Sequence, residues 1–219
     1  MVPVLTIDIV SDVVCPWCYI GKRKLEAALA LPGAATLPPV ELRWHPFQLN
    51  PDMPASGVSR KQYLEDKFGG PERATEIYAR VKAAGRTAGL ELNIDGITLQ
   101  PNTLAAHALI AFAQQGGGAA GSDIKERVLK AYFVENRFIG SVDVLAAIAG
   151  EAGLDADAAR SFVSDPERLQ AVAQADAQAR SMGIGGVPFF IFNQKLAVSG
   201  AQDPATLLDA MQQAVAAAG

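Results

Sequence analysis

The sequence is poor in the residues that bind metal ions and nucleic acids. Its 219 residues include two cysteines and two histidines, and 19 lysines and arginines stand against 23 acidic residues, a net charge of −4. This balance provides no basic surface for nucleic acid or for an anionic membrane. His45 and His107 are far apart and form no pair at the spacing of zinc ligands, so we expect no metal site.

Long apolar runs are also missing, although half of the residues are hydrophobic. No run approaches the roughly 20 residues that a membrane-spanning helix needs, so we expect no membrane association. The opening segment MVPVLTIDIVSDVV alternates in character and lacks a basic region and a small-residue cleavage site, which favours a first strand over a signal peptide. We therefore expect a cytoplasmic protein, in a compartment where structural disulfides are rare.

The two cysteines nevertheless lie within four positions, in the segment CPWCYIGKRKL at residues 15–25. Three explanations are open: a redox dithiol, half of a metal site, or two small buried residues that are close by accident. A metal site would need two further ligands, which the separated histidines do not supply. The strand-like segment before it and Pro16, a residue suited to the first position of a helix, favour a dithiol of the thioredoxin type.

The position of the dithiol assigns a role to each cysteine. The helix is predicted to continue to about residue 30, which places Cys15 at its N-terminus and Cys18 one turn deeper, with Lys22, Arg23 and Lys24 on a solvated face. Unpaired backbone N–H groups and the helix dipole stabilise a thiolate at that end, and cysteines in such motifs have pKa values lowered to roughly 3.5–7.5. We therefore expect Cys15 to be the exposed, attacking thiol and Cys18 the buried thiol that resolves the intermediate.

The chain divides into three stretches of different character. Residues 1–50 predict strand, helix, strand; residues 51–164 predict helices, with a doubtful strand pair around Asp95-Gly96; residues 165–219 predict helix, two strands and helix. We therefore predict an α/β protein in which one discontinuous domain, 1–50 with 165–219, carries an inserted all-helical domain, 51–164. The insertion is expected to cover the CPWC end and form one wall of a substrate groove. Predicted N-caps are Ser59, Ser141, Asp155 and Asp165.

A second candidate feature is Val187-Pro188 in the segment GGVPFF, where a proline opens an apolar strand. A proline at a strand start or on an edge strand would explain it, since proline cannot donate a ladder hydrogen bond. The alternative is a cis Val187–Pro188 bond that turns the Val187 backbone toward the CPWC segment, where it can pair with an extended substrate chain. The presence of CPWC favours this alternative.

These motifs carry a family resemblance that extends over essentially the whole chain. The chain resembles the DsbA-family thioredoxin-like oxidoreductases, and in particular their FrnE-like branch, in the segments SDVVCPWCYIGKRKLE, WHPFQLNPDMP, PNTLAAHAL, GVPFFIFN and VSGAQ. The resemblance implies a thioredoxin-like fold with a helical domain inserted and a cis Pro188. It also implies thiol–disulfide oxidoreductase or disulfide isomerase activity, with Cys15 and Cys18 as the redox pair.

Two departures from the relatives limit what the resemblance implies. Periplasmic DsbA proteins have a histidine between the cysteines, whereas this chain has Pro16-Trp17, so a strongly oxidising potential is not implied. Kappa-class glutathione transferases and 2-hydroxychromene-2-carboxylate isomerases resemble the architecture but usually have serine where this chain has Cys15. A glutathione-dependent transferase or isomerase is therefore the alternative function, and a non-catalytic binding module is a third.

Several further residues are candidates for substrate binding. Trp17 lies between the cysteines, and Trp44 either packs the junction with the insertion or lines the groove. Asn102 stands near a predicted helix start, and His107, among alanines and leucines, is either a core histidine or an acid–base group. The segment from Ser199 to Gln202 is a turn before a helix or, by resemblance, a site for the γ-glutamyl end of glutathione.

The expected partners follow from this chemistry. Substrates would be disulfide-containing proteins or low-molecular-weight thiols, which react through a mixed disulfide at Cys15. The resemblance implies no tightly bound cofactor and admits glutathione as a co-substrate. It also admits a homodimer, since relatives often dimerise.

Overall fold

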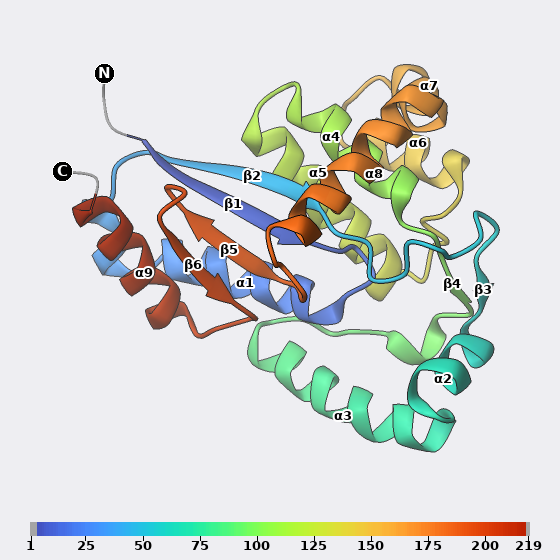
Figure 1. Cartoon of the computed structure of the whole chain (residues 1–219). Helices are drawn as coiled ribbons and strands as arrows, with labels where there is room; N and C mark the ends of the chain where they lie inside the picture. The colour runs from blue at the N-terminus through green and yellow to red at the C-terminus, as the bar shows by residue number, and fades with distance from the viewer. Residues whose placement is uncertain (1–3, 218–219) are drawn as a thin grey trace.

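A four-stranded mixed sheet forms the centre of the computed structural model, which describes residues 4–217 (Figure 1). The strand order is β2-β1-β5-β6, with β1 and β2 parallel and the other neighbours antiparallel. The strands are β1 (Leu5–Ser11), β2 (Val40–Pro46), β5 (Phe189–Phe192) and β6 (Leu196–Ser199). Segments from both ends of the sequence therefore build one sheet.

The register of this sheet brings three distant loops to the same end. In the antiparallel pair of β1 and β5, Val10 lies opposite Phe189. In the pair of β5 and β6, Phe189 lies opposite Ser199. The residues that follow β1, precede β5 and follow β6 therefore meet, and these residues include the CPWC segment and Pro188.

Two helices, α1 (Pro16–Leu29) and α9 (Pro204–Ala216), pack on each other along one face of the sheet (Figure 1). Each begins with a proline at its first position, where the missing N–H group costs nothing. Alternate residues of β1 point toward this layer and are fully buried, as period-two patterning requires. The buried side chains of this layer include Leu5, Ile7, Ile9, Ile20, Leu25, Phe190, Phe192 and Met211.

The middle of the chain is predominantly helical, which confirms an α/β protein with a helical insertion. In Figure 1, α4 to α8 gather beside β2, and α2 and α3 lie on the other side of α1. The elements are η1 (Pro32–Thr36), β3 (Val58–Ser59), α2 (Arg60–Phe68), α3 (Pro71–Thr87), η2 (Ile94–Gly96), β4 (Leu99–Gln100), α4 (Leu104–Gln114), α5 (Gly118–Phe133), α6 (Val142–Glu151), α7 (Ala156–Ser164) and α8 (Pro166–Ser181). No helix in residues 4–217 combines the length and hydropathy needed to cross a membrane.

The predicted helix caps are confirmed. The Ser59 hydroxyl accepts a hydrogen bond from the Gln62 N–H at 3.2 Å, and the Asp165 carboxylate accepts one from the Glu167 N–H at 2.8 Å. Ser141 and Asp155 cap α6 and α7 in the same way. Local side-chain chemistry is therefore sufficient to start these helices.

The strand pair that the sequence suggests around Asp95-Gly96 is wrong, and a different short pair is present in the insertion. β3 and β4 form a two-residue antiparallel ladder in which Val58 lies opposite Gln100. Asp95 and Gly96 do not form a hairpin turn but lie in the 3₁₀ helix η2. Strands of two residues leave no period-two pattern in a sequence, so this pairing could not be predicted locally. The boundaries at residues 50 and 164 stay a prediction.

Candidate active site

The CPWC segment connects β1 to α1, and Cys15 is the N-cap residue of that helix. Its backbone is extended, with φ −95° and ψ 113°, and Pro16 takes the first helical position. The Cys18 N–H donates to the Cys15 carbonyl oxygen at 3.0 Å, closing the first turn. The Cys15 sulfur therefore lies at the end of α1 where backbone N–H groups are free to donate to an anion.

The prediction that Cys15 is exposed is wrong, because a loop from the other half of the sheet covers it. Cys15 is 6% exposed and Cys18 is 1% exposed. The Cys15 Sγ donates to the Val187 carbonyl oxygen at 3.7 Å, across 172 residues of sequence. Trp17, which is 42% exposed, is the residue of the motif that faces solvent. The two cysteines are free thiols in this structure.

The two thiols have pKa shifts of opposite sign. A hydrogen bond from the Cys18 thiol lowers the pKa of Cys15, and the backbone N–H groups of Cys18 and Trp17 lower it further. Burial acts in the opposite direction, but the net result is a pKa below the usual value for cysteine. Burial raises the pKa of Cys18, and the hydrogen bond and negative charge of Cys15 raise it further, to well above the usual value. Of the two thiols, Cys15 is therefore the one that loses its proton more readily.

The Val187–Pro188 bond is cis, which confirms the prediction for this loop. Pro188 lies directly against α1 at a position occupied by glycine. A Cβ atom on Gly21 would lie 2.8 Å from the Pro188 Cγ atom, closer than carbon atoms tolerate. Gly21 therefore permits the proline to approach the helix that carries both cysteines.

The turn from Ser199 to Gln202 lies beside the same proline. The Gly200 N–H donates to the Pro188 carbonyl oxygen at 2.8 Å, and Gly200 adopts a left-handed conformation with φ 82°. The Gln202 amide donates to the Ser199 carbonyl oxygen at 2.9 Å, which holds the turn closed. The structure thus brings this turn to the Val187–Pro188 loop, and glutathione binding there stays a prediction.

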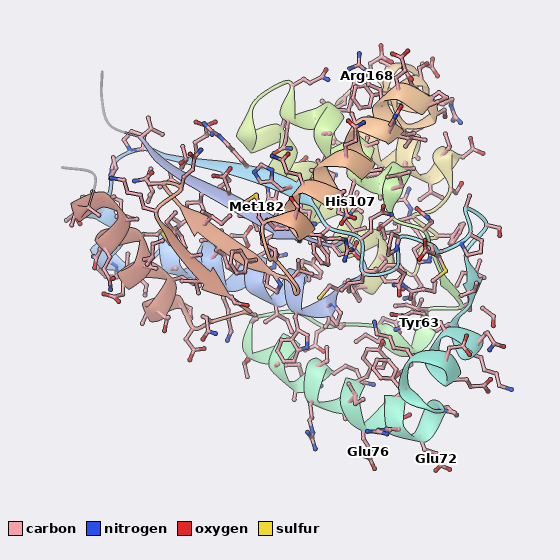
Figure 2. All side chains as sticks on the ribbon, viewed as in Figure 1. Tyr63, Glu72, Glu76, His107, Arg168 and Met182 are labelled. Carbon is pink, nitrogen blue, oxygen red and sulfur yellow. The ribbon has the colours of Figure 1, made fainter. Side chains whose placement is uncertain are left out.

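A buried carboxylate lies in the connection between β1 and the CPWC motif. Asp12 is fully buried and accepts hydrogen bonds from the N–H groups of Val13 at 2.7 Å and Leu49 at 2.8 Å. The His107 Nε2 atom lies 3.1 Å from its Oδ1 atom. Burial acts to raise the pKa of Asp12, but His107, Leu49 and Lys125 lower it, and the net direction is down. His107 is therefore a core histidine with a carboxylate partner; Figure 2 shows it in the interior, whereas Glu72 and Glu76 extend from the outer surface of α3.

Lys125 on α5 adds a buried positive charge to this region. It is 1% exposed, and burial lowers its pKa to about 8 against the opposing charges of Cys18, Asp12 and Cys15. Lys125 belongs to none of the motifs named above, whereas Asp12 lies in the segment SDVVCPWCYIGKRKLE, and neither is predicted from the sequence as a functional residue, although both leave a signal. Asp12 follows the apolar first strand, and Lys125 shares the helical face of Val128 and Tyr132, at spacings of three and seven.

Trp44 and Asn102 have their polar groups occupied by partners within the fold. The Trp44 Nε1–H donates to the Ser122 hydroxyl at 2.9 Å. The Asn102 amide donates to the Met53 carbonyl oxygen at 2.6 Å, and its oxygen accepts from the Leu104 N–H at 2.8 Å. Both side chains anchor the segments around them, and a role for either in substrate binding stays a prediction.

The predicted solvated face of α1 is wrong for Lys22. Its side chain is buried, and its Nζ atom donates to the Glu126 carboxylate of α5 at 2.8 Å. Arg23 donates to the same carboxylate, and Glu26 pairs with both cations. The sequence gives no sign that α5, which carries Glu126, packs against α1, so the sequence alone provides no partner for Lys22 and Arg23 in α5. Within residues 4–217, no cluster of three His, Cys, Asp or Glu side chains could hold a metal ion.

Known proteins are similar to this chain over most of their length. The probable DsbA oxidoreductase SCO1869 from Streptomyces coelicolor has a TM-score of 0.85 and 28% sequence identity, over 97% of this chain and 90% of that chain. The uncharacterized protein YwbO of Bacillus subtilis (strain 168) is 28% identical over 186 residues, which are 84% of this chain and 85% of YwbO.

A more distant structure shows the same fold. The cytosolic disulfide reductase DsbM from Pseudomonas aeruginosa has a TM-score of 0.63 and 20% identity, over 97% of this chain and 96% of that chain, and its structure with GSH gives 0.61. The thioredoxin-like fold with a helical insertion is confirmed. A family model for the DSBA-like thioredoxin domain matches residues 6–212, and the chain therefore belongs to the DSBA-like thioredoxin domain family.

Proposed function

We propose that the protein is a thiol–disulfide oxidoreductase or disulfide isomerase that uses Cys15 as its nucleophile and Cys18 as its resolving thiol. One observation carries the proposal. A cysteine of lowered pKa caps the first turn of α1 and lies 3.7 Å from the carbonyl oxygen that precedes the cis Pro188. Thiolate character and access to a substrate backbone are the two requirements of the first step.

In that step the Cys15 thiolate attacks one sulfur of a substrate disulfide. A sulfur–sulfur bond forms between Cys15 and the substrate, the original disulfide breaks, and the departing sulfur leaves as a thiolate. The Val187 backbone offers groups that an extended substrate can pair with, as an added strand does at a sheet edge. The exposed ring of Trp17 provides apolar contact beside the same sulfur.

In the second step Cys18 attacks the Cys15 sulfur of the mixed disulfide. The Cys18 thiol loses its proton to the released substrate thiolate, the Cys15–Cys18 disulfide forms, and the second substrate sulfur departs as a thiolate. The substrate gains two electrons and the protein loses two. The positive charge of Lys125 favours the Cys18 thiolate while it forms, since it lowers the pKa of that thiol. The reverse sequence oxidises a dithiol substrate.

Glutathione is the low-molecular-weight partner that we propose, in a reducing cytoplasm. DsbM, a cytosolic disulfide reductase with the same fold, has been solved with GSH. The turn from Ser199 to Gln202 lies against Pro188, in the loop that covers Cys15, and its Ser199 and Gln202 side chains are exposed. This turn is the proposed contact for the γ-glutamyl end of the tripeptide.

Replacing the resolving thiol separates this function from a glutathione-dependent transferase or isomerase. In a single turnover of pre-reduced protein with no added thiol, Cys18→Ser should release at least tenfold less reduced insulin than the parent and should accumulate mixed disulfides at Cys15, because no other thiol is present to resolve them. Conjugation of glutathione to an electrophile needs no resolving thiol and should survive the change. Cys15→Ala is the control that loses both activities, because it removes both the thiol and the serine hydroxyl that the transferases and isomerases usually have at this position. Full reductase turnover in Cys18→Ser would refute the proposed roles.

A further inference from the structure

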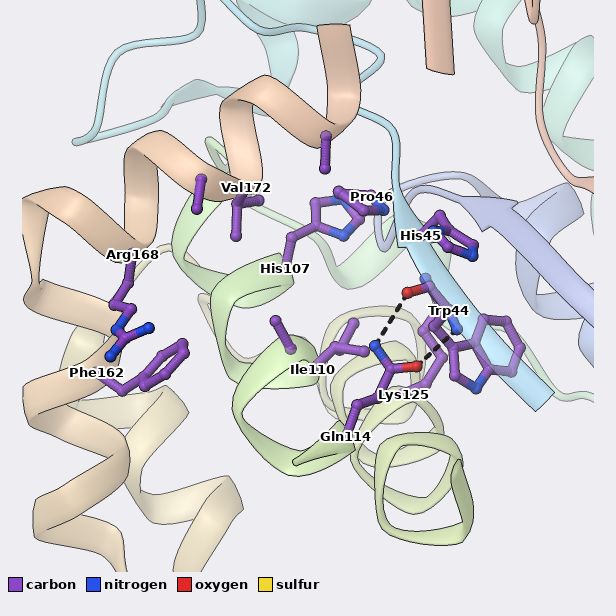
Figure 3. A pocket seen from close by; sticks show the side chains of 13 residues that line it. Trp44, His45, Pro46, His107, Ile110, Gln114, Lys125, Phe162, Arg168 and Val172 are labelled. Carbon is purple, nitrogen blue, oxygen red and sulfur yellow. Dashed lines mark hydrogen bonds between the residues drawn. The ribbon is translucent and has the colours of Figure 1, made fainter. Parts of the chain in front are cut away.

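A pocket of about 190 Å³ lies between β2, α4, α5 and α8 (Figure 3). Neither cysteine lines it, nor does Val187 or Pro188. Its walls are apolar in the middle, where Ile110 of α4 faces Val172 of α8, with Phe162 of α7 beside them. The pocket therefore lies apart from the two sulfurs, although Lys125 and His107 connect it to their surroundings.

The two ends of this pocket carry positive charge. Figure 3 shows Lys125 at one end, beside Trp44 and Gln114, and Arg168 at the other end, over the ring of Phe162. The Arg168 guanidinium lies 5.1 Å from that ring centre and stands at the solvent side. None of the described residues that line the pocket is acidic. The electrostatic character of the cavity thus suits an anion.

Lys125 lacks a partner for its ammonium group although it is almost completely buried. Its Nζ atom lies 5.4 Å from the centre of the Trp44 ring and makes no side-chain hydrogen bond or ion pair within residues 4–217, although the charges of Asp12 and the two cysteines act on it from a greater distance. The nearby carboxylate of Asp12 already accepts hydrogen bonds from two backbone N–H groups and contacts His107. A buried ammonium without an oxygen partner is costly, which is a reason to expect a ligand oxygen there.

We propose that this pocket binds a small carboxylate with a compact apolar body. The carboxylate pairs with the Lys125 ammonium, and the body fills the space between Ile110, Phe162 and Val172. Size supports this class of ligand, because an apolar cavity of about 150 Å³ accommodates benzene. The Gln114 amide is held in place at the rim, since its oxygen accepts from the Trp44 N–H at 2.7 Å and its NH₂ group donates to the Trp44 carbonyl oxygen at 3.0 Å.

Calorimetric titration of the full chain with three carboxylates tests this inference. Benzoate, 3-methylbutanoate and cyclopentanecarboxylate are the probes, and benzyl alcohol and benzylamine are the neutral and cationic controls. We expect saturable 1:1 binding of at least one carboxylate, with both controls at least tenfold weaker. The absence of saturable binding by all three carboxylates, or equal binding of benzyl alcohol, would overturn the proposal.

Two variants locate the site. Lys125→Met keeps the length of the side chain and removes its charge, and should weaken carboxylate binding at least tenfold; Lys130→Met on the solvent side of the same helix is the matched control and should not change it. Ala111→Phe fills the pocket from α4 and should abolish binding while leaving Lys125 in place. Unchanged affinity in both pocket variants would place the ligand elsewhere. Double replacement of the cysteines by serine should leave binding intact, because the inference does not depend on thiol chemistry.

Discussion

Asp12 carries a negative charge in the interior, and hydrogen bonds to both of its carboxylate oxygens stabilise that charge. Both carboxylate oxygens accept a backbone N–H, and one also contacts His107. Removing a charged acceptor from such a network leaves its donors without partners in a medium of low dielectric. At the scale of single residues, three buried ionisable side chains therefore lie in the neighbourhood of the cysteines: the acid Asp12 and the bases His107 and Lys125.

Replacing Asp12 by asparagine tests this organisation. The variant exchanges one acceptor oxygen for an NH₂ group, so the Leu49 N–H or His107 loses its partner, and we expect the free energy of unfolding at pH 7 to fall by about 1–3 kcal/mol. The pKa of Asp12 is lower in the folded protein than its reference value of 3.8, so its stabilisation is complete above pH 3.8 and is lost as the pH falls toward the folded pKa. The difference between parent and variant should therefore shrink below pH 3.8.

Urea unfolding at pH 7, 5 and 3, followed by circular dichroism, measures this difference. Asp143→Asn is the control, because its exposed carboxylate lies on α6 and pairs with Arg160 at the surface. A variant at Asp12 that is as stable as the parent at pH 7 would contradict the account, and so would a difference that grows in acid.

At the scale of elements, the contact between α1 and the loop before β5 determines the geometry of the thiols. The loop is held from two sides: Pro188 lies against Gly21, and its carbonyl oxygen accepts from Gly200. The helix presents Cys15 to this loop because its first turn begins one residue after the cysteine. The distance between the sulfur and the Val187 carbonyl oxygen therefore depends on how closely the proline approaches the helix.

Gly21→Ala tests this dependence. The added Cβ atom would lie 2.8 Å from the Pro188 Cγ atom and 3.4 Å from the Phe190 ring, so the loop must move away from α1. We expect a loss of about 1–3 kcal/mol in the free energy of unfolding, the usual effect of overpacking, and slower reduction of insulin. Gly150→Ala is a matched control in a helix, since its new Cβ atom would make an ordinary contact of 3.6 Å with Ala156.

The control should be neutral or slightly stabilising, because alanine is favoured over glycine in a helix by about 0.5–1 kcal/mol. Equal effects of Gly21→Ala and Gly150→Ala on stability and on insulin reduction would show that the geometry of the thiols does not depend on how closely Pro188 approaches α1.

Over the whole molecule, the sequence predicts the elements better than their mutual arrangement. Caps and prolines at helix starts act within a few residues, and CPWC with GGVPFF contains the two loops that meet at the thiols. The parts that could not be predicted depend on tertiary contacts. Glu126 of α5 pairs with Lys22 and Arg23 of α1 across about a hundred positions, which turns a face expected to be solvated into an interface. Lys125 approaches Cys18 for the same reason, since α5 packs against both α1 and β2.

This packing of the two parts of the chain also explains the burial of Cys15. A cysteine at a helix start is expected to be exposed, but the loop at Val187 comes from beyond the insertion and covers its sulfur. The sequence contains both partners of this contact, and only the pairing of β1 with β5 brings them together. The exposure of the Cys15 sulfur therefore depends on a loop 172 residues away in the sequence.

The central claim is that Cys15 and Cys18 form one reversible redox pair. Equilibration of the protein in buffers of varied reduced and oxidised glutathione, followed by acid quenching, alkylation and mass mapping, tests it most directly. The protein should show a single transition in which it loses two hydrogen atoms and the pair becomes a Cys15–Cys18 disulfide, while Cys18→Ser should stop at a glutathione mixed disulfide on Cys15. Thiols that stay free at every ratio, or glutathione attached to Cys18 in place of Cys15, would contradict it.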